Sequence, residues 1–182
     1  MKKLLNILLP LSLFWMFTAS RCKKDVLPPE TQEGKNTFGC YVNGELFVPG
    51  GGGLGPIKTC YYQLIYPSES GYVFHVSASD KRGNISKNIA INIDSIKISE
   101  GLVIQLKHVT RGVVGGGQYS GEQGADGIHR FYTTDEAVGQ IVINKFDEAN
   151  HIAAGTFWFT AVNSQGETVK ITDGRFDMEF TR

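Results

Sequence analysis

Alternation of apolar and polar side chains in residues 152–180, near the C-terminal end, constrains the fold of this chain more than any other feature. Phe157, Phe159 and Ala161 recur at every second position, the period of a strand with one buried face. The alternation resumes twice further on, and each interruption carries turn residues. We therefore predict three short strands, laid back and forth, at residues 156–162, 168–172 and 175–180, with turns at 163–166 and 173–174.

A hairpin signal lies at residues 37–49, where Asn43 and Gly44 separate two short apolar runs. An Asn-Gly pair tolerates the positive φ angles of a type I′ turn, whose twist matches that of paired strands. A two-residue loop at this point sets Cys40 opposite Phe47.

Between these regions the chain alternates short apolar runs with polar turns, and no helical pattern separates them. Residues 112–127 are rich in glycine and poor in apolar side chains, so we predict a loop there, with at most a brief strand around Tyr119. Strands without intervening helices argue against a parallel α/β sheet. Further strands are predicted at residues 59–66, 72–79, 88–98, 102–107, 128–132 and 140–146.

These segments together predict one all-β globular domain over residues 37–182. About ten short strands with regularly spaced turns favour an antiparallel β-sandwich. The alternative is a lipocalin-like β-barrel, which would carry an apolar ligand in a lined cavity instead of a packed core.

Charge argues against one class of partner. The chain has 18 basic and 18 acidic side chains and no net charge. No basic cluster follows Lys23 and Lys24, whereas a nucleic-acid surface needs a basic stripe that releases counterions from the phosphates. We therefore expect no nucleic-acid partner.

Residues 1–21 have the form of a secretory signal peptide, in which two lysines precede a short apolar stretch at residues 4–17. As a helix of about 14 residues, that stretch would reach only ~21 Å, less than the ~30 Å of a bilayer's hydrocarbon core. Cys22 follows, and the arrangement resembles the lipobox of bacterial lipoproteins. Arg21 departs from that pattern, in which Gly, Ala or Ser usually precedes the cysteine.

The lipobox resemblance implies that Cys22 receives a diacylglycerol after the signal is removed. Lys23, Lys24 and Asp25 resemble the charged segment of Bacteroidota-type lipoproteins, which implies anchoring to the outer membrane, facing the periplasm or the surface. Residues 22–36 contain prolines, charges and little to bury, so we predict a flexible tether. At ~3.1 Å per residue it would span roughly 40 Å.

A second resemblance rests on two motifs, FGCYVNGELFVP near the start and GTFWFTAV with VKITDGRFDMEF at the end. Together they are similar to an uncharacterised family of Bacteroidota envelope lipoproteins that is known only as a domain of unknown function. The resemblance covers most of residues 36–182. It implies an all-β domain behind a lipid anchor, and no catalytic or binding residues are established for the family that could be carried over to this chain.

Several side chains are candidates for chemistry or modification. Cys40 and Cys60 permit a disulfide in an exported domain, or else they are two small buried residues. Trp158 is out of phase with its buried neighbours, so it either covers the sheet or lies exposed, where it would stack on a sugar or contact an envelope protein. Ser95 lies in an Asp-Ser-apolar motif that resembles O-glycosylation sites of Bacteroidota exported proteins.

Catalytic and metal motifs are lacking in the sequence. The glycine runs lack the Lys-Ser/Thr of a phosphate loop, Ser120 does not lie in a nucleophile elbow, and the four histidines lack metal-ligand spacing. We therefore predict a non-enzymatic, lipid-anchored binding or structural domain without a cofactor or metal. The alternatives are a small envelope hydrolase or lyase, whose residues would meet in a cleft with His75 or His129, and the lipocalin-like carrier.

Overall fold

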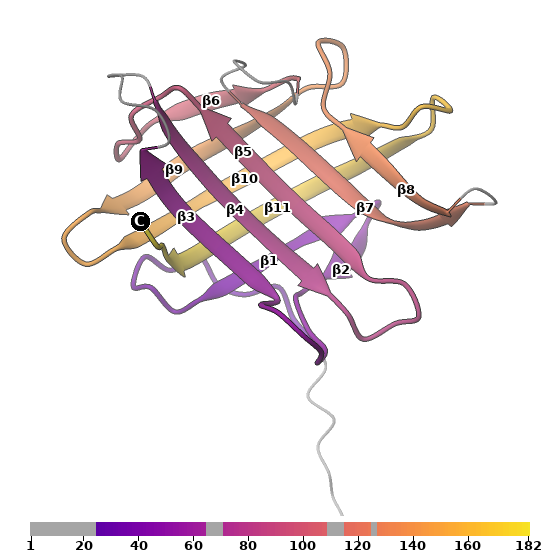
Figure 1. The fold of residues 1–182 in the computed structure, drawn as a ribbon, viewed down its shortest axis with the longest axis horizontal. Helices are drawn as coiled ribbons and strands as arrows, with labels where there is room; N and C mark the ends of the chain where they lie inside the picture. Colours follow the sequence, from indigo (N-terminus) through magenta and orange to yellow (C-terminus); the bar gives the residue numbers. More distant parts are fainter. Residues whose placement is uncertain (1–24, 65–70, 109–114, 125–126) are drawn as a thin grey trace, which may run out of the picture.

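The computed structural model describes residues 25–64, 71–108, 115–124 and 127–182, which form eleven strands and no helix, so none of these residues belongs to a helix that could cross a membrane (Figure 1). The pairing between strands is antiparallel throughout. The strands are β1 (Thr37–Val42), β2 (Glu45–Phe47), β3 (Lys58–Leu64), β4 (Tyr72–Asp80), β5 (Lys87–Asp94), β6 (Val103–Leu106), β7 (Gly116–Gly124), β8 (Gly127–Tyr132), β9 (Gly139–Asp147), β10 (Ile152–Val162) and β11 (Thr168–Glu179).

The strands form two layers that belong to one hydrogen-bonded sheet. Its order is β2-β1-β11-β10-β8-β7-β5-β4-β3, and β9 pairs with both β10 and β6. In Figure 1 a front layer of β3, β4, β5 and β7 crosses a back layer of β9, β10, β11 and β1. The layers are joined where β8 meets β10, at Tyr132 and Val162. The sheet is not closed into a barrel, so the antiparallel all-β prediction is confirmed and the lipocalin-like alternative is not.

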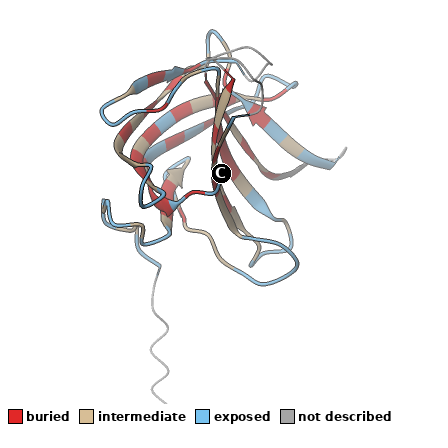
Figure 2. Cartoon of the chain, turned by 60° about the vertical axis from the view of Figure 1, so that its left-hand side comes forward, coloured by how far each residue is buried: buried red, intermediate tan, exposed pale blue. Residues whose placement is uncertain are grey.

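The core lies between the layers and follows the predicted alternation. Phe157, Phe159 and Phe176 are all buried, and buried residues alternate with more exposed ones along the strands in Figure 2. Phe74 of the front layer packs against Phe176 of the back layer, with ring centroids 6.2 Å apart. Each such side chain contributes about 1.5–3 kcal/mol by leaving water. The predicted hairpin is also confirmed, because Cys40 pairs with Phe47.

The C-terminal region has two long strands instead of the three short ones predicted. β11 runs through residues 173–174 without a break, because an extra residue in β11 forms a bulge against both β10 and β1. Asp173 adopts a φ of 52° there. A methyl group on Gly174 would lie 2.4 Å from the ring of Phe157, so only glycine fits.

The prediction of a loop over residues 112–127 is wrong for β7. This strand pairs with β5 and β8, and its Tyr119 is buried. Its glycines allow close packing, since a methyl group on Gly117 would lie 2.9 Å from the ring of Phe159. Glycine marks close approach of a neighbouring side chain here, whereas the sequence pattern alone indicates a turn.

Residues 25–36 differ from the flexible tether predicted over 22–36. They form neither helix nor strand, but they are bound to the domain. Thr31 Oγ1 donates a hydrogen bond to Asp177 Oδ2 at 2.6 Å, and Asp25 forms an ion pair with Arg82 beyond β4. The segment is ordered because the domain supplies partners for its polar groups.

Candidate ligand-binding groove

Trp158 lies on the outer face of the back layer, where it is 46 % exposed. Its neighbours Phe157 and Phe159 face the core, so the two-residue period of β10 turns Trp158 outward. It pairs with Gln140 of β9. Of the two readings of Trp158 left open by the sequence, the structure favours exposure.

A groove of about 340 Å³ lies beside Trp158. Cross-strand pairing sets Thr156 between Val142 of β9 and Arg175 of β11, and all three line the groove. The bulge in β11 adds Asp173. The remaining lining residues are Glu30, Gln140, Phe157 and Gly174. Glu30 precedes β1, so the groove combines the outer face of three strands with the N-terminal segment.

Arg175 connects these walls. Its Nε donates a hydrogen bond to the carbonyl of Asp173 at 3.3 Å, and its Nη1 donates one to the carbonyl of Pro28 at 3.4 Å. Its Nη1 also lies 3.7 Å from Glu30 Oε1. The guanidinium is therefore held in place while several of its five donors stay available to a ligand.

The groove combines an apolar aromatic surface with several polar groups. An exposed indole presents a flat apolar surface to the C–H face of a sugar, and surrounding amide, hydroxyl, carboxylate and guanidinium groups can bind its hydroxyls. Within the described ranges, no group of three or more His, Cys, Asp or Glu side chains is placed to hold a metal ion.

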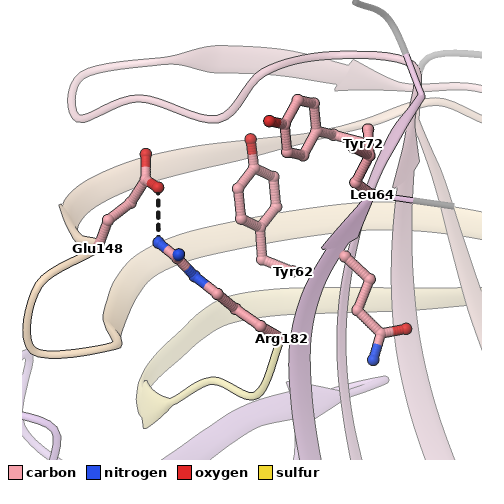
Figure 3. A pocket seen from close by; sticks show the side chains of 6 residues that line it. Tyr62, Leu64, Tyr72, Glu148 and Arg182 are labelled. Atoms are coloured by element: carbon pink, nitrogen blue, oxygen red, sulfur yellow. Dashed lines mark hydrogen bonds and ion pairs between the residues drawn. The ribbon is translucent and has the colours of Figure 1, made fainter. Parts of the chain in front are cut away.

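A second cavity, of about 380 Å³, opens at one end of the sandwich (Figure 3). Its floor is Tyr62, whose ring stacks on Tyr72 with centroids 4.9 Å apart. Arg182 and Glu148 at the opening form an ion pair at 2.8 Å. Tyr62 also packs edge-on against Phe146 in the core. This cavity is the end of the core, and its charged groups already bind each other.

A third cavity, of about 470 Å³, lies at β8 and the turn after β10. His129 lines it, and His129 Nδ1 lies 3.3 Å from Glu167 Oε2. Its exposed large hydrophobic side chains are Ile128 and Tyr132. The contact between His129 and Glu167 has the character of a surface ion pair, because the side chain of Glu167 is 57 % exposed.

His75 is the centre of a Ser-His-Asn chain on the outer face of the front layer. Asn92 Oδ1 lies 2.7 Å from His75 Nδ1, and Ser77 Oγ lies 2.9 Å from Nε2. Because Asn92 Oδ1 can only accept, Nδ1 carries the proton and Nε2 accepts from Ser77. Tyr61 stacks on the imidazole with centroids 4.7 Å apart. Burial lowers the pKa of His75, while the hydrogen bond with Asn92 acts in the opposite direction.

The hydrogen-bonded series Ser77–His75–Asn92 has the order of a catalytic triad, but the oxyanion hole and substrate cavity of a hydrolase do not accompany it among the features described here. Ser77 pairs with Thr59 on one side and Ala90 on the other, so the surrounding backbone N–H groups belong to the ladder and form no oxyanion hole. None of the three cavities described above includes Ser77, His75 or Asn92. His75 lies on β4 and His129 on β8, and none of these three cavities contains both.

The other predicted site residues have varied positions. Cys40 and Cys60 are buried free thiols, so no disulfide joins them in this structure. Burial raises the pKa of both, that of Cys60 to about 12, which leaves the thiols unreactive. Ser95 is exposed in the bend after β5, and its modification stays a prediction. Cys22 lies outside the described residues.

Sequence reasoning missed two charged residues of β11 at or near the groove beside Trp158. Arg175 lines the groove, and Asp177, two residues further along β11, is only 1 % exposed, but the alternation of the sequence assigns neither of them a role. The run of polar residues 30–36 directly before β1 was the available signal, because a bound segment needs donors and acceptors of this kind.

A family model described as a domain of unknown function (DUF6252) matches residues 72–178. Comparisons with curated proteins and with solved structures found no match. The matched segment contains the strands that carry Trp158 and His75, while the hairpin motif at residues 37–49 and Glu30 lie outside it.

Proposed function

This chain belongs to the DUF6252 family, a domain of unknown function, and from the chemistry of its surface we propose that it is a non-enzymatic glycan-binding domain. Its binding site is the groove beside Trp158. The bound sugar stacks on the indole, and its hydroxyls bind Gln140, Asp173 and Arg175.

The observation that carries this proposal is the exposure of Trp158 above a polar groove. Burying an aromatic side chain of this size contributes about 1.5–3 kcal/mol, so a sheet face that leaves one in water gives up stabilisation. Glu30 and Asp173 against Arg175 give the lining one net negative charge, which suits an uncharged sugar better than an acidic one. A partner protein at the same face is an alternative outcome of the test.

We propose further that the domain is anchored at the outer membrane through lipid on Cys22. The lipobox-like signal supports this proposal. Covalent geometry limits the distance from Cys22 to Asp25 to about 11 Å. Since residues 25–36 lie along the domain, the groove is then held close to the bilayer instead of roughly 40 Å away. Labelling with a fatty-acid analogue should modify the native chain and not Cys22→Ser; equal labelling of both contradicts the anchor.

The competing hydrolase has one observation in its favour, the Ser77–His75–Asn92 chain. The backbone around Ser77 belongs to the strand ladder and forms no oxyanion hole, and none of the three cavities described above includes these residues. Removing a single oxyanion donor already costs about 10²–10³ in rate. A fluorophosphonate probe that labelled Ser77 would favour the hydrolase over the binding domain.

Binding to a panel of soluble polysaccharides, including dextran, xylan, laminarin, pectin and mucin glycans, tests the proposal by affinity electrophoresis. We expect retardation by at least one of them. Trp158→Ala should weaken that binding by about 10-fold or more, because the stacking surface is lost, while Trp158→Phe retains part of it.

Tyr132→Ala is the matched control, since Tyr132 is an exposed aromatic residue beside a different cavity. It should bind like the native chain. If no polysaccharide retards the protein, or Trp158→Ala and Tyr132→Ala behave alike, the groove is not a glycan site.

A further inference from the structure

Asp177 is a buried acid on the outer face of β11. Its carboxylate accepts four hydrogen bonds from one short segment of the chain. The donors are Thr31 Oγ1 at 2.6 Å and the backbone N–H groups of Glu33, Gly34 and Lys35 at 3.1, 2.7 and 3.3 Å. Successive N–H groups that converge on one carboxylate fix the backbone that carries them, much as an anion-binding nest does.

Other contacts attach the same segment on both sides of Asp177. Asn36 Oδ1 accepts a hydrogen bond from the backbone N–H of Glu179 at 3.1 Å. Pro28 packs over β1, since a methyl group on Gly39 would lie 2.5 Å from Pro28 Cδ. Residues 28–36 are therefore fastened at several points, and the carboxylate of Asp177 holds the centre.

The segment ends at the Trp158 groove. Arg175, two residues before Asp177 on the same face of β11, donates to the carbonyl of Pro28 and lies 3.7 Å from Glu30 Oε1. Glu30 and Arg175 both line the groove with Trp158. On the outer face of β11, the carboxylate of Asp177 thus fixes the segment, and the guanidinium of Arg175 joins it to the groove.

We propose that residues 28–36 are a built-in wall of the Trp158 groove and that Asp177 is the residue that positions this wall. The wall brings Glu30 to Arg175, so it sets the charge beside the indole. The use of this wall in ligand binding rests on the proposed function, but its existence does not. Only Val26 and Leu27 separate this segment from Asp25, so the wall also couples the groove to any attachment of the chain on its N-terminal side.

A ligand-free experiment tests the wall through the charge near Trp158. In the full chain with Trp15→Phe, Trp158 is the sole tryptophan, and its fluorescence is quenched with iodide, caesium and neutral acrylamide. Asp177→Asn should release the segment and leave Arg175 without Glu30. Iodide quenching relative to acrylamide should then rise about 1.5- to 2-fold and caesium quenching should fall, as one unscreened charge at this range predicts.

Proteolysis reports the release itself. Trypsin should cleave after Lys35 about tenfold faster in Asp177→Asn than in the native chain, because the backbone N–H of Lys35 is bound to Asp177 in the native chain. Glu179→Gln, which removes the same charge from the same strand, is the matched control and should keep the native ratio and rate. If Asp177 only stabilised the fold, Asp177→Asn would change the stability without shifting iodide and caesium quenching of Trp158 in opposite directions.

The proposal is overturned if Asp177→Asn folds and keeps the native quenching ratio and cleavage rate. If that variant does not fold, Thr31→Ala decides, since it removes one donor outside the core and should shift both readouts less, in the same direction. An unchanged Thr31→Ala overturns the proposal. Failure of every polysaccharide to bind would remove the proposed function and leave this result standing.

Discussion

The two outer faces of the sandwich differ in how their polar and aromatic groups find partners. On the front layer, Tyr61, His75, Ser77 and Asn92 bind one another in a continuous set of short contacts. On the back layer, Trp158 stays 46 % exposed beside a groove. Both faces lie on the same kind of antiparallel strand, so strand geometry alone does not create the difference.

The difference between the two outer faces arises from irregular features of the back layer. β4 pairs with β3 and β5 in an unbroken register, so its outward side chains meet directly opposite partners. β11 carries a bulge next to Trp158, and the pairing there skips a position. The bulge leaves Trp158 without an aligned partner on β11, and the groove forms at that place. An outer face whose polar and aromatic side chains bind one another stabilises the fold. A face that leaves such side chains exposed is available for binding.

The largest predicted effect separates two adjacent aromatic residues of β10. Phe159→Ala should lower the free energy of unfolding by about 3–5 kcal/mol, because it leaves a cavity in the core. Trp158→Ala should lower it by about 1 kcal/mol or less, because the indole packs on the surface only. Urea unfolding followed by circular dichroism measures both.

The comparison of Trp158→Ala with Phe159→Ala also tests the contrast between the two outer faces. If Trp158→Ala destabilised the protein as much as Phe159→Ala, Trp158 would be a structural cover of the back layer, and the two outer faces would be alike. Retained stability together with lost polysaccharide binding would mark Trp158 as a residue of the site.

Much of the fold could be predicted from the alternation of side chains. The buried positions Phe157, Phe159 and Phe176 follow from it, and so does the pairing of Cys40 with Phe47 across an Asn-Gly turn. These features depend on residues close in sequence. Local periodicity and turn chemistry are therefore sufficient to predict them.

The features of the fold and the groove that could not be predicted depend on residues far apart in sequence. Gly117 is indistinguishable from a loop glycine until Phe159 is packed on it, and Asp177 reads as a surface charge until residues 31–35 bind it. The groove shares this property, because Trp158 could be predicted to face outward while Glu30 and Arg175 could not be predicted to meet beside it. A site assembled by a bulge and a distant segment leaves no local signature.

A smaller effect distinguishes the two faces by pH. On the front layer, burial lowers the pKa of His75 below its ordinary value of 6.5. The unfolded chain then binds a proton that the folded one does not, so stability is lost as pH falls below about 6.5. The slope of unfolding free energy against pH just below this value should flatten in His75→Gln and stay unchanged in Asp177→Asn.

On the back layer the corresponding change lies at lower pH. Burial alone would raise the pKa of Asp177, but the hydrogen bonds from Thr31, Glu33, Gly34 and Lys35 outweigh it, and the pKa lies below its ordinary 3.8. The carboxylate therefore stabilises the fold above that value, and this contribution is lost as pH falls through the folded pKa.

Asp80 and Asp147 also have lowered pKa values and lose stabilisation in the same acid range, so the informative quantity is the difference between the native chain and Asp177→Asn. That difference should be greatest near neutral pH and shrink below 3.8. If the difference shrank instead around pH 6.5, the groups on the two faces would be coupled, and the wall would depend on the His75 network and not on Asp177.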